Sequence, residues 1–346
     1  HFGLSSALQR LTPSPWCPCS SPAPSHTIAR MMAASVHAGD LCHFQLQDED
    51  MVLRFEKLLG TGAFGEVWMC ANTSTGEPVA LKAVRQQDLN QAREEARKHQ
   101  RAVDAAKTTY VPAFFFCEMG TIMPESGTDA GVQPQSLLGI AMQYIDGCSL
   151  GALVRKLEFR RLELMQACCV CRDLFRALAR LHAHDIVHCD VKSDNLMVSR
   201  TGDCYLCDFG VATFLADYQD ETRAMPVVGT PSHMAPELFR TRPVRFGCKL
   251  DVWSAGILAF EMSLGRTPWH HEVDLHLPRQ GYIFDTLKII EGVDVSMVPY
   301  QGPYSRMLED CFQVDPEERI NARDIFDEMQ FNQHLPVWRE ILVGLI

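Results

Sequence analysis

The chain has 346 residues, long enough for two ordinary domains or for one two-lobed domain. Its hydrophobic fraction of 47% allows a large core and argues against a chain that is disordered throughout. The formal net charge of −11 argues against a protein that binds nucleic acid through a basic face, so we expect no nucleic-acid partner.

The 14 cysteines are spread along the chain without a regular spacing, unlike the disulfide framework of a small secreted domain. No apolar leader stands at the N-terminus, and no run approaches the roughly 20 apolar residues that a membrane-spanning helix needs. We therefore expect free thiols, a reducing cytoplasmic compartment and no membrane span.

The first part of the chain differs in composition from the rest. Residues 1–39 contain no Asp or Glu and are rich in Ser, Pro and Ala, which is compatible with a transit peptide. The stretch CPCSSPAPS cannot form an amphipathic helix, so we favour a disordered or untranslated segment over 1–48. The chain begins with His1, and Met31 or Met32 could be the true start.

Strand patterns dominate the next part. Residues 51–60 alternate apolar and polar side chains, and 65–84 reads as two strands around a turn at 72–76. The Ala-rich, charged stretch 89–107 predicts a helix, and 111–119 with 136–145 predicts a strand pair around a polar loop. Helices are expected after Gly147, and the tail 337–346 resembles a docking or amphipathic segment.

The clearest helix is expected over 160–183, where apolar residues recur at spacings of three and four. The cluster Cys168-Cys169-Val170-Cys171 lies in this helix and places two thiols on the apolar stripe. Buried cysteine commonly acts as a small apolar residue, and no matching CxxC provides further ligands, so we expect no zinc site. Cys17 with Cys19, and His270 with His271, receive the same interpretation.

A glycine-rich motif, Gly60-Thr-Gly62-Ala-Phe-Gly65, lies between two predicted strands. Such glycines let the backbone approach an anion and offer N–H groups to phosphate. The strand that follows excludes a dinucleotide site, and no Gly-Lys-Ser/Thr completes a Walker motif. Lys82 lies on a strand of this region and could meet phosphate and a carboxylate of the next helix, Glu94 or Glu95.

The stretch IVHCDVKSDNLMV, from residue 186, contains Asp190, Lys192 and Asn195, and Asp208-Phe209-Gly210 follows 18 residues after Asp190. Two carboxylates with an amide between them can divide the chemistry. One can accept a hydroxyl proton, while the other and the Asn oxygen can hold a hard dication. Taken alone, each Asp could equally be a turn residue in a loop.

Taken together, these motifs resemble the protein kinase family. The glycine loop, VALK at 79–82, HCDVKSDN at 188–195, DFG at 208–210, APE at 235–237, LDVWSAG at 250–256 and DP through Arg319 occur in the family's order. The resemblance covers residues 53–336. It implies an α+β two-lobed kinase fold, with a small antiparallel-sheet N-lobe and one helix (53–143), a mainly helical C-lobe (147–336) and a short tail.

The resemblance also implies residue roles. Asp190 would accept the proton of the substrate hydroxyl, and Asn195 with Asp208 would hold Mg²⁺. Lys82 would hold the α- and β-phosphates of ATP and pair with Glu95, which we prefer to Glu94. Lys192 would steady the γ-phosphate, and Lys at that position accompanies Ser/Thr acceptors, as does Thr230 beside it. The predicted nucleotide-binding set is Leu59, Gly60, Thr61, Gly62, Ala63, Phe64, Gly65, Glu66, Val67, Ala80, Lys82, Met142, Gln143, Ile145 and Leu196. Within this set Met142 would be the gatekeeper, and the backbone of Gln143 and Ile145 would bind the adenine edge.

Cys189 departs from the family pattern, because most members have an Arg there that binds a phosphate on the activation segment. Cysteine is short and lacks the guanidinium fork. We therefore expect activity that depends less on phosphorylation of that segment, and we favour a space-filling thiol over a redox role beside Cys204 or Cys207.

The expected function is transfer of the γ-phosphate of Mg-ATP to Ser or Thr of protein substrates. The sequence is most like kinases of the STE and related cascades. A pseudokinase that acts as an ATP-binding scaffold is the alternative, although neither the Lys nor either Asp is missing. A small-molecule phosphotransferase is disfavoured by the APE segment, which forms a peptide platform in the family.

Overall fold

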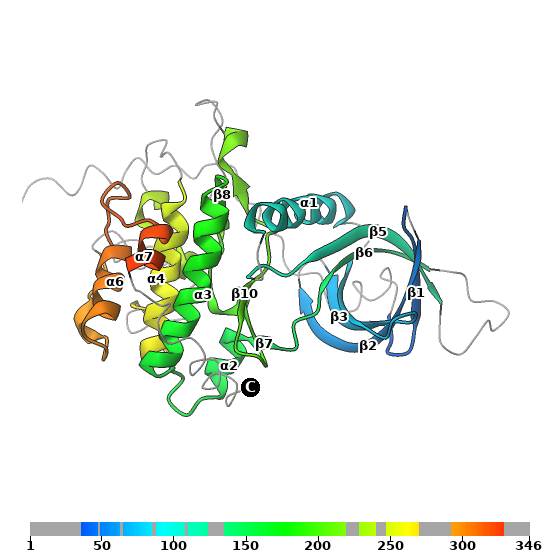
Figure 1. Cartoon of the computed structure of the whole chain (residues 1–346), viewed down its shortest axis with the longest axis horizontal. Coiled ribbons are helices and arrows are strands. Elements are labelled where there is room, and N and C mark those ends of the chain that lie inside the picture. The colour runs from blue at the N-terminus through cyan, green and yellow to red at the C-terminus, as the bar shows by residue number, and fades with distance from the viewer. Residues whose placement is uncertain are drawn as a thin grey trace, which may run out of the picture. The chain divides into compact units, whose positions relative to one another are not determined.

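The computed structural model describes residues 36–47, 49–62, 65–84, 88–107, 110–123, 135–218, 228–239, 247–269 and 292–328. Outside these residues lie 1–35 and 48 of the predicted segment 1–48, Ala63 and Phe64, the His270–His271 pair and the tail 337–346. In the described part the strands gather at one side and most helices at the other, which confirms the predicted α+β two-lobed fold (Figure 1).

The N-terminal lobe is a closed antiparallel barrel with the strand order β1-β2-β3-β4-β6-β5. Its elements are β1 (Leu41–Gln45), β2 (Asp50–Gly62), β3 (Gly65–Asn72), β4 (Pro78–Val84), helix α1 (Leu89–Ala106), β5 (Phe114–Met123) and β6 (Gln135–Gln143). The predicted strands, the turn at 72–76 and the helix over 89–107 are therefore confirmed. Helix α1 lies against β5 and β6 (Figure 1).

Strand β1 corrects the predicted boundary. We expected a disordered or untranslated segment up to residue 48, and for residues 36–47 this is wrong because they are ordered and include β1. β1 pairs with β2 on one side and with β5 on the other, so it closes the barrel. Phe44 points inward, and a Cβ at Gly120 or Gly139 would come within 2.6 or 2.7 Å of its ring. The strand was missed because only two apolar residues carry its pattern and its partner β5 is distant in sequence.

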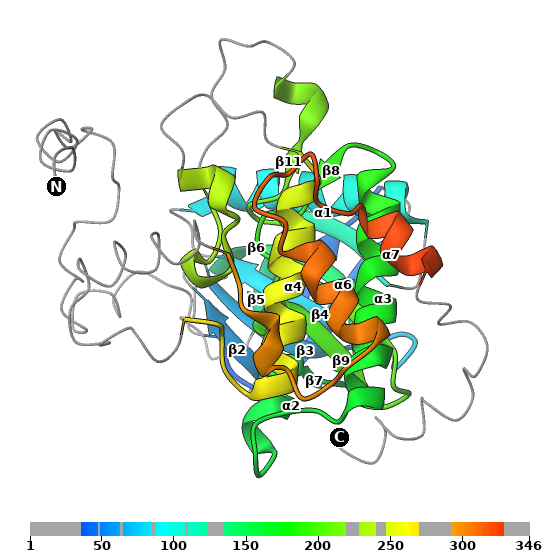
Figure 2. The same ribbon diagram turned by 90° about the vertical axis from the view of Figure 1, so that its left-hand side faces the viewer.

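The C-terminal lobe begins after a short connector, as expected. Its elements are β7 (Gly147–Ser149), α2 (Leu150–Lys156), α3 (Leu164–His182), β8 (Ile186–Val187), η4 (Ser193–Asn195), β9 (Leu196–Ser199), β10 (Cys204–Leu206), β11 (Thr213–Phe214), η5 (Leu215–Tyr218), η6 (Pro231–His233), η7 (Pro236–Phe239), α4 (Lys249–Leu264), η8 (Val295–Met297), α6 (Pro303–Cys311) and α7 (Ala322–Glu328). Helix α4 packs against both α3 and α6, and α7 packs against α3 (Figure 2).

The core of this lobe is built around α4, whose residues are buried on all sides, among them Trp253, Ile257 and Phe260. Helix α3 buries Cys169 and Cys171, and Cys168 is partly buried against the same core. Among the described residues no group of His, Cys, Asp and Glu could hold a metal ion as a cluster of three or more. The absence of a zinc site at Cys168–Cys171 therefore remains our interpretation. No helix in the described ranges has the length and apolar character needed to cross a membrane.

Candidate active site

The loop 188–195 follows β8 and is held by a carboxylate of α4. Asp251 is fully buried; its Oδ2 accepts the backbone N–H of His188 at 2.8 Å and its Oδ1 that of Cys189 at 2.9 Å. Oδ2 also lies 2.9 Å from Nε2 of His182 on α3. Cys189 has φ of +66°, a left-handed conformation that is costly for a non-glycine residue. Helix α4 therefore fixes a strained backbone immediately before Asp190.

Asp190 lies at the centre of a polar network. Lys192 Nζ donates to Oδ2 at 2.7 Å, and the hydroxyl of Thr230 donates to Oδ1 at 2.6 Å. Lys192 also donates to the Thr230 oxygen at 2.8 Å, and Asn195 Nδ2 donates to Oδ2 of Asp190 at 2.9 Å. The structure thus brings together Asp190, Lys192, Asn195 and Thr230 as the sequence predicts.

This network sets the charge of Asp190. Burial on its own would raise the pKa of the carboxyl, but the hydrogen bonds from Lys192 and Thr230 outweigh burial and lower the pKa below its usual value. The side chain is therefore an anion at neutral pH. An anionic carboxylate next to an ammonium group and a hydroxyl can accept a proton from an incoming hydroxyl.

Asp208 and Asn195 are joined through the backbone, since the N–H of Cys207 donates to the carbonyl of Asn195 at 2.8 Å. The amide nitrogen of Asn195 donates to both the backbone carbonyl and the carboxylate of Asp190, so the amide oxygen is the atom that could act as a metal ligand. Asp208 has φ of +66°, and its Oδ1 accepts the N–H of Gly210 at 3.2 Å. Oxygen donors of this kind fit a hard cation such as Mg²⁺.

Phe209 anchors the segment that carries Asp208. Its ring is 1% exposed, stacks on His99 of α1 at 5.4 Å and meets the edge of His188 at 5.1 Å, both between ring centroids. His99 donates from Nε2 to the carbonyl of Pro112 at 2.8 Å, which fixes the tautomer of a neutral ring. Burial lowers the pKa of His99. The phenyl ring therefore connects α1 to the loop that carries Asp190.

Lys82 pairs with Glu95 rather than Glu94. Its Nζ lies 2.6 Å from Oε1 and 2.7 Å from Oε2 of Glu95, with both side chains mostly buried. Glu94 is exposed and lies 3.6 Å from Arg97 on the same helix. The choice follows from helix periodicity, because Ala92, Ala96 and His99 define the face of α1 that meets the barrel and Glu95 lies beside them.

The glycine loop joins β2 to β3, where Gly60 pairs with Val67, Thr61 with Glu66 and Gly62 with Gly65. A Cβ at Gly60 would meet nothing within 4 Å, so packing does not require glycine there. A Cβ at Gly65 would lie 2.1 Å from the carbonyl of Ala83, so Gly65 is required by the fold. Open space above Gly60 suits the close approach of a ligand to the backbone.

The remaining positions of the predicted nucleotide slot line up in adjacent strands. Val67 pairs with Lys82, and Ala80 pairs with Met142 on β6. The N–H of Gln143 donates to the carbonyl of Ala113 at 2.8 Å, at the start of the connector to β7. The other members are Leu59, which is 42% exposed, and Ile145 and Leu196, which are buried at 8% and 1%.

The thiol of Cys189 is not poised for chemistry. Burial and the neighbouring Asp251 raise its pKa to about 12, and its Sγ donates weakly to the carbonyl of Val187 at 3.6 Å. Cys207 also has its pKa raised to about 12 by burial and by Asp208. Neither residue is a thiolate at neutral pH, which favours the space-filling interpretation.

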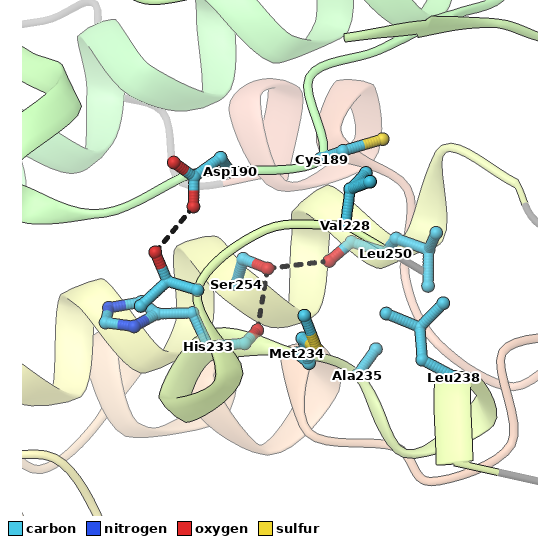
Figure 3. A pocket seen from close by; sticks show the side chains of 10 residues that line it. Cys189, Asp190, Val228, His233, Met234, Ala235, Leu238, Leu250 and Ser254 are labelled. Atoms are coloured by element: carbon cyan, nitrogen blue, oxygen red, sulfur yellow. Dashed lines mark hydrogen bonds between the residues drawn. The ribbon is translucent and has the colours of Figure 1, made fainter. Parts of the chain in front are cut away.

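The segment 228–239 faces Asp190 and is attached to α4. Ser254 donates to the carbonyl of His233 at 2.8 Å, and Trp269 Nε1 donates to the carbonyl of Ser232 at 2.9 Å. Gly229 has φ of +109°, and a Cβ there would lie 2.2 Å from the carbonyl of Cys189. Between this segment and Cys189 lies a cavity of ≈ 20 Å³, room for about one water molecule (Figure 3).

Arg319 forms a buried ion pair with Glu237 of the APE motif. It donates from Nη1 and Nη2 to the two oxygens of Glu237 at 2.7 and 2.9 Å, and both side chains are buried. Its Cζ lies 5.0 Å from the ring centroid of Trp253, and Nη1 also donates to the carbonyl of Lys249 at 2.9 Å. The ion pair ties the segment after Thr230 to the start of α4.

Sequence reasoning missed four residues that contribute to the site. Asp251 appeared only as part of a helix motif, and its hydrogen bonds to the loop were not foreseen. His99 was not singled out, although a lone His on an alanine face is a usable signal. Lys98 and Arg101 of α1 contact the segment that follows Asp208, and two basic residues three apart on a charged helix gave no sign of it.

The comparisons with known proteins agree with this geometry. A mitogen-activated protein kinase kinase kinase, mkh1 of Cytospora mali, is 27% identical over 276 residues, which are 80% of this chain and 14% of that protein. The serine/threonine-protein kinase BCK1/SLK1/SSP31 of Saccharomyces cerevisiae is 26% identical over 78% of this chain and 17% of its own length. The serine/threonine-protein kinase ste20 of Emericella nidulans is 33% identical over 58% of this chain and 22% of its own.

The matched stretch is therefore between 14% and 22% of the length of these three relatives. The family model that matches is that of the protein kinase domain, and it spans residues 53–331 of this chain. It includes the glycine loop, the Lys82–Glu95 pair, the loop 188–195 and the Glu237–Arg319 pair. The chain belongs to the protein kinase family.

Proposed function

We propose that this protein is a serine/threonine protein kinase that transfers the γ-phosphate of Mg-ATP to hydroxyl groups of protein substrates. The observation that carries the proposal is the network around Asp190, in which a carboxylate held as an anion lies 2.7 Å from Lys192 and 2.6 Å from a hydroxyl. The names of the relatives, which are serine/threonine and MAP kinase kinase kinases, support the same class of acceptor.

In this mechanism the substrate hydroxyl donates its proton to Asp190 as its oxygen forms a bond to the γ-phosphorus. The bond from that phosphorus to the β,γ-bridging oxygen breaks, and ADP leaves. Lys192 holds the γ-phosphate in line, because its ammonium lies beside the same carboxylate. Lys82, positioned by Glu95, binds the α- and β-phosphates, and the backbone of the glycine loop covers them.

Asn195 and Asp208 would hold the magnesium ion through oxygen atoms. The ion held there would supply positive charge that offsets the charge developing on the transferred phosphoryl group. The positions of these residues depend on Phe209, which anchors Asp208, and on Asp190, which orients the Asn195 amide. The adenine ring would lie between Ala80 and Val67 above and Leu196 below, with Met142 as gatekeeper and the backbone of Gln143 and Ile145 at its edge.

We also propose a reducing compartment such as the cytoplasm, because the cysteines within the described residues are free thiols. The substrates themselves are proteins that bear Ser or Thr. The STE-like character of the sequence and the names of the relatives, among them a MAP kinase kinase kinase and a ste20 kinase, support a role in a kinase cascade.

The test is transfer from labelled Mg-ATP to myelin basic protein after treatment with phosphatase. Asp190→Asn is expected to lower kcat by about a hundredfold or more while Mg-ATP binding persists. Asp104→Asn, an exposed Asp on α1 that accepts from Gln100, serves as the matched control. Phosphoamino-acid analysis should find phosphoserine and phosphothreonine. Wild-type protein that binds Mg-ATP but transfers nothing would contradict the proposal and favour the scaffold alternative.

A further inference from the structure

Helix α1 carries Glu95, but its apolar contacts with the rest of the lobe are made mainly by small side chains. Its fully buried residues are Ala92, Ala96, Ala102, Ala106 and His99, and of its larger apolar side chains Leu89 and Val103 are only partly buried. Alanine buries little apolar surface, and hydrophobic stabilisation scales with the area removed from water. The position of α1 must therefore depend strongly on its polar contacts.

Two of these contacts reach the segment that follows Asp208. Lys98 Nζ donates to the carbonyl of Gly210 at 3.2 Å, and the N–H of Gly210 donates to Asp208. Lys98 lies one turn after Glu95 on the same helix. A shift of α1 would therefore disturb Lys82–Glu95 and the backbone next to Asp208 together.

Arg101, one turn further, binds the same segment at its other end. Its Cζ lies 3.4 Å from the ring centroid of Phe214, and its Nη1 lies 3.5 Å from Oδ2 of Asp217. Phe214 is 4% exposed and pairs with Ile186 of β8, immediately before the loop that carries Asp190. The guanidinium thus rests on a ring that is fixed to the core of the C-terminal lobe.

The relative strength of these contacts can be ordered. The Arg101–Asp217 pair is about half exposed on both sides, and such pairs contribute little. The guanidinium over a buried ring is the stronger contact, since a cation over an aromatic face gains when the ring is out of water. Cys189, in contrast, brings no charge to this segment: its buried thiol is uncharged at neutral pH and makes only weak hydrogen bonds, such as the one to the carbonyl of Val187 at 3.6 Å.

We propose that Lys98 and Arg101 are positioning residues that hold α1 against the segment 208–217, so that Glu95 and Asp208 are set in place without a phosphate on that segment. The inference rests on the proposed kinase function and names the regulation of its site. The negative charge that faces Arg101 is Asp217, which belongs to the chain itself. In this arrangement the carboxylate of Asp217 and the ring of Phe214 take the role that a phosphate on the segment would otherwise have.

The experiment compares the full chain, freed of phosphate and verified by intact-mass spectrometry, with Arg101→Ala, Lys98→Ala and Arg101→Lys. Arg97→Ala is the matched control, because Arg97 is exposed and pairs within the helix with Glu94. We expect kcat/KM for ATP to fall about tenfold in Arg101→Ala and in Lys98→Ala, mainly through KM. Arg101→Lys should recover only part, because an ammonium cannot stack as a planar guanidinium does. Arg97→Ala should match the wild type.

Two further readouts do not depend on catalysis. Hydrogen exchange at 210–218 should become faster in Arg101→Ala while exchange in α4 is unchanged, which separates repositioning from general unfolding. Binding of Mg-ADP, measured by calorimetry, should weaken in the same variants. These arms hold even if the wild type transfers no phosphate, so failure of the proposed function is distinguishable. Equal exchange and affinity in Arg101→Ala and Arg97→Ala would overturn the inference, as would a wild type that needs a phosphate for activity.

Discussion

Helices α1 and α4 both contribute carboxylates to the site, but they are held in opposite ways. Helix α4 is surrounded by core residues and fixes the loop 188–195 through the fully buried Asp251. Helix α1 rests on alanines, and its carboxylate, Glu95, is set by Lys82 and by the contacts of Lys98 and Arg101. Large buried side chains make α4 a fixed frame, whereas small ones leave α1 adjustable.

This difference suits the chemistry. In the proposed mechanism the groups that contact the substrate hydroxyl must keep their geometry, because misplacement of reacting groups is costly in rate. Asp190 is therefore attached to the helix that has least freedom. In the proposed mechanism the groups that bind the nucleotide phosphates include Lys82 and Glu95, whose placement depends on a few polar contacts of α1.

The largest effect is expected from a substitution that removes the ion pair next to α4. Arg319→Ala leaves Glu237 as an unpaired buried charge and removes a contact with Trp253 of α4. Removing one partner of such a pair costs about 3–5 kcal/mol, so urea unfolding should shift far to lower denaturant. Arg323→Ala, whose partner Asp327 is exposed, is the control and should change little.

A double variant sharpens this prediction. Glu237→Leu with Arg319→Met removes both charges and keeps the volume apolar, so it should recover part of the lost stability. If Arg319→Ala unfolds at the same urea concentration as Arg323→Ala, the pair does not anchor α4 and the frame must have another source.

The next prediction compares a substitution that adds volume to α4, Gly256→Ala, with one that adds volume to α1, Ala96→Leu. A Cβ at Gly256 of α4 would lie 2.8 Å from Cβ of Cys311 and 2.9 Å from the ring of Phe312, so Gly256→Ala should destabilise by about 1–3 kcal/mol. Ala96→Leu on α1 adds more volume against Leu138 and Ile140. We expect it to shift the helix, so that kcat/KM falls while the melting temperature falls less than in Gly256→Ala.

The measurements are the melting temperature and kcat/KM of both variants, taken from the same preparations. A larger drop in melting temperature for Ala96→Leu than for Gly256→Ala would mean that α1 is as rigidly packed as α4. The contrast between the two helices would then fail, and with it the reason for assigning a positioning role to Lys98 and Arg101.

The sequence predicted the residues grouped in short motifs better than the contacts between distant parts of the chain. The loop 188–195 and Asp208–Gly210 carry several reactive side chains within short segments, so their grouping could be anticipated. Glu95, preferred to Glu94 as the partner of Lys82, is the residue that pairs with it in the structure. Contacts between distant, individually ordinary residues could not. Arg101 meets Phe214 and Asp217 only because β11 pairs with β8, and Phe44 closes the barrel only because β5 has Gly120 opposite it. Such contacts depend on topology, which short patterns do not specify.

The smallest expected effect concerns the buried histidines next to the two helices, His99 on α1 and His233 against α4. Burial lowers the pKa of His233 from 6.5 to about 4, and its ring faces Glu261 of α4, with Nε2 3.9 Å from Oε2. A lowered folded-state pKa means that the unfolded chain binds the proton more readily. The stability that neutral His233 contributes is present above pH 6.5 and is lost as the pH falls toward 4.

Between pH 7.5 and 5.5 we expect this group to cost about 1 kcal/mol of unfolding free energy, and His233→Leu should flatten the pH dependence. Burial raises the pKa of Glu261, so its contribution runs the other way: it is present at low pH and is lost as the pH rises through the folded-state value. Glu261→Gln should therefore steepen the loss on acidification. The measurement is urea unfolding at several pH values, with the exposed His184→Gln as control. A slope that His233→Leu leaves unchanged would show that this ring titrates as it does in the unfolded chain, and that the contact of the 228–239 segment with α4 is looser than the frame requires.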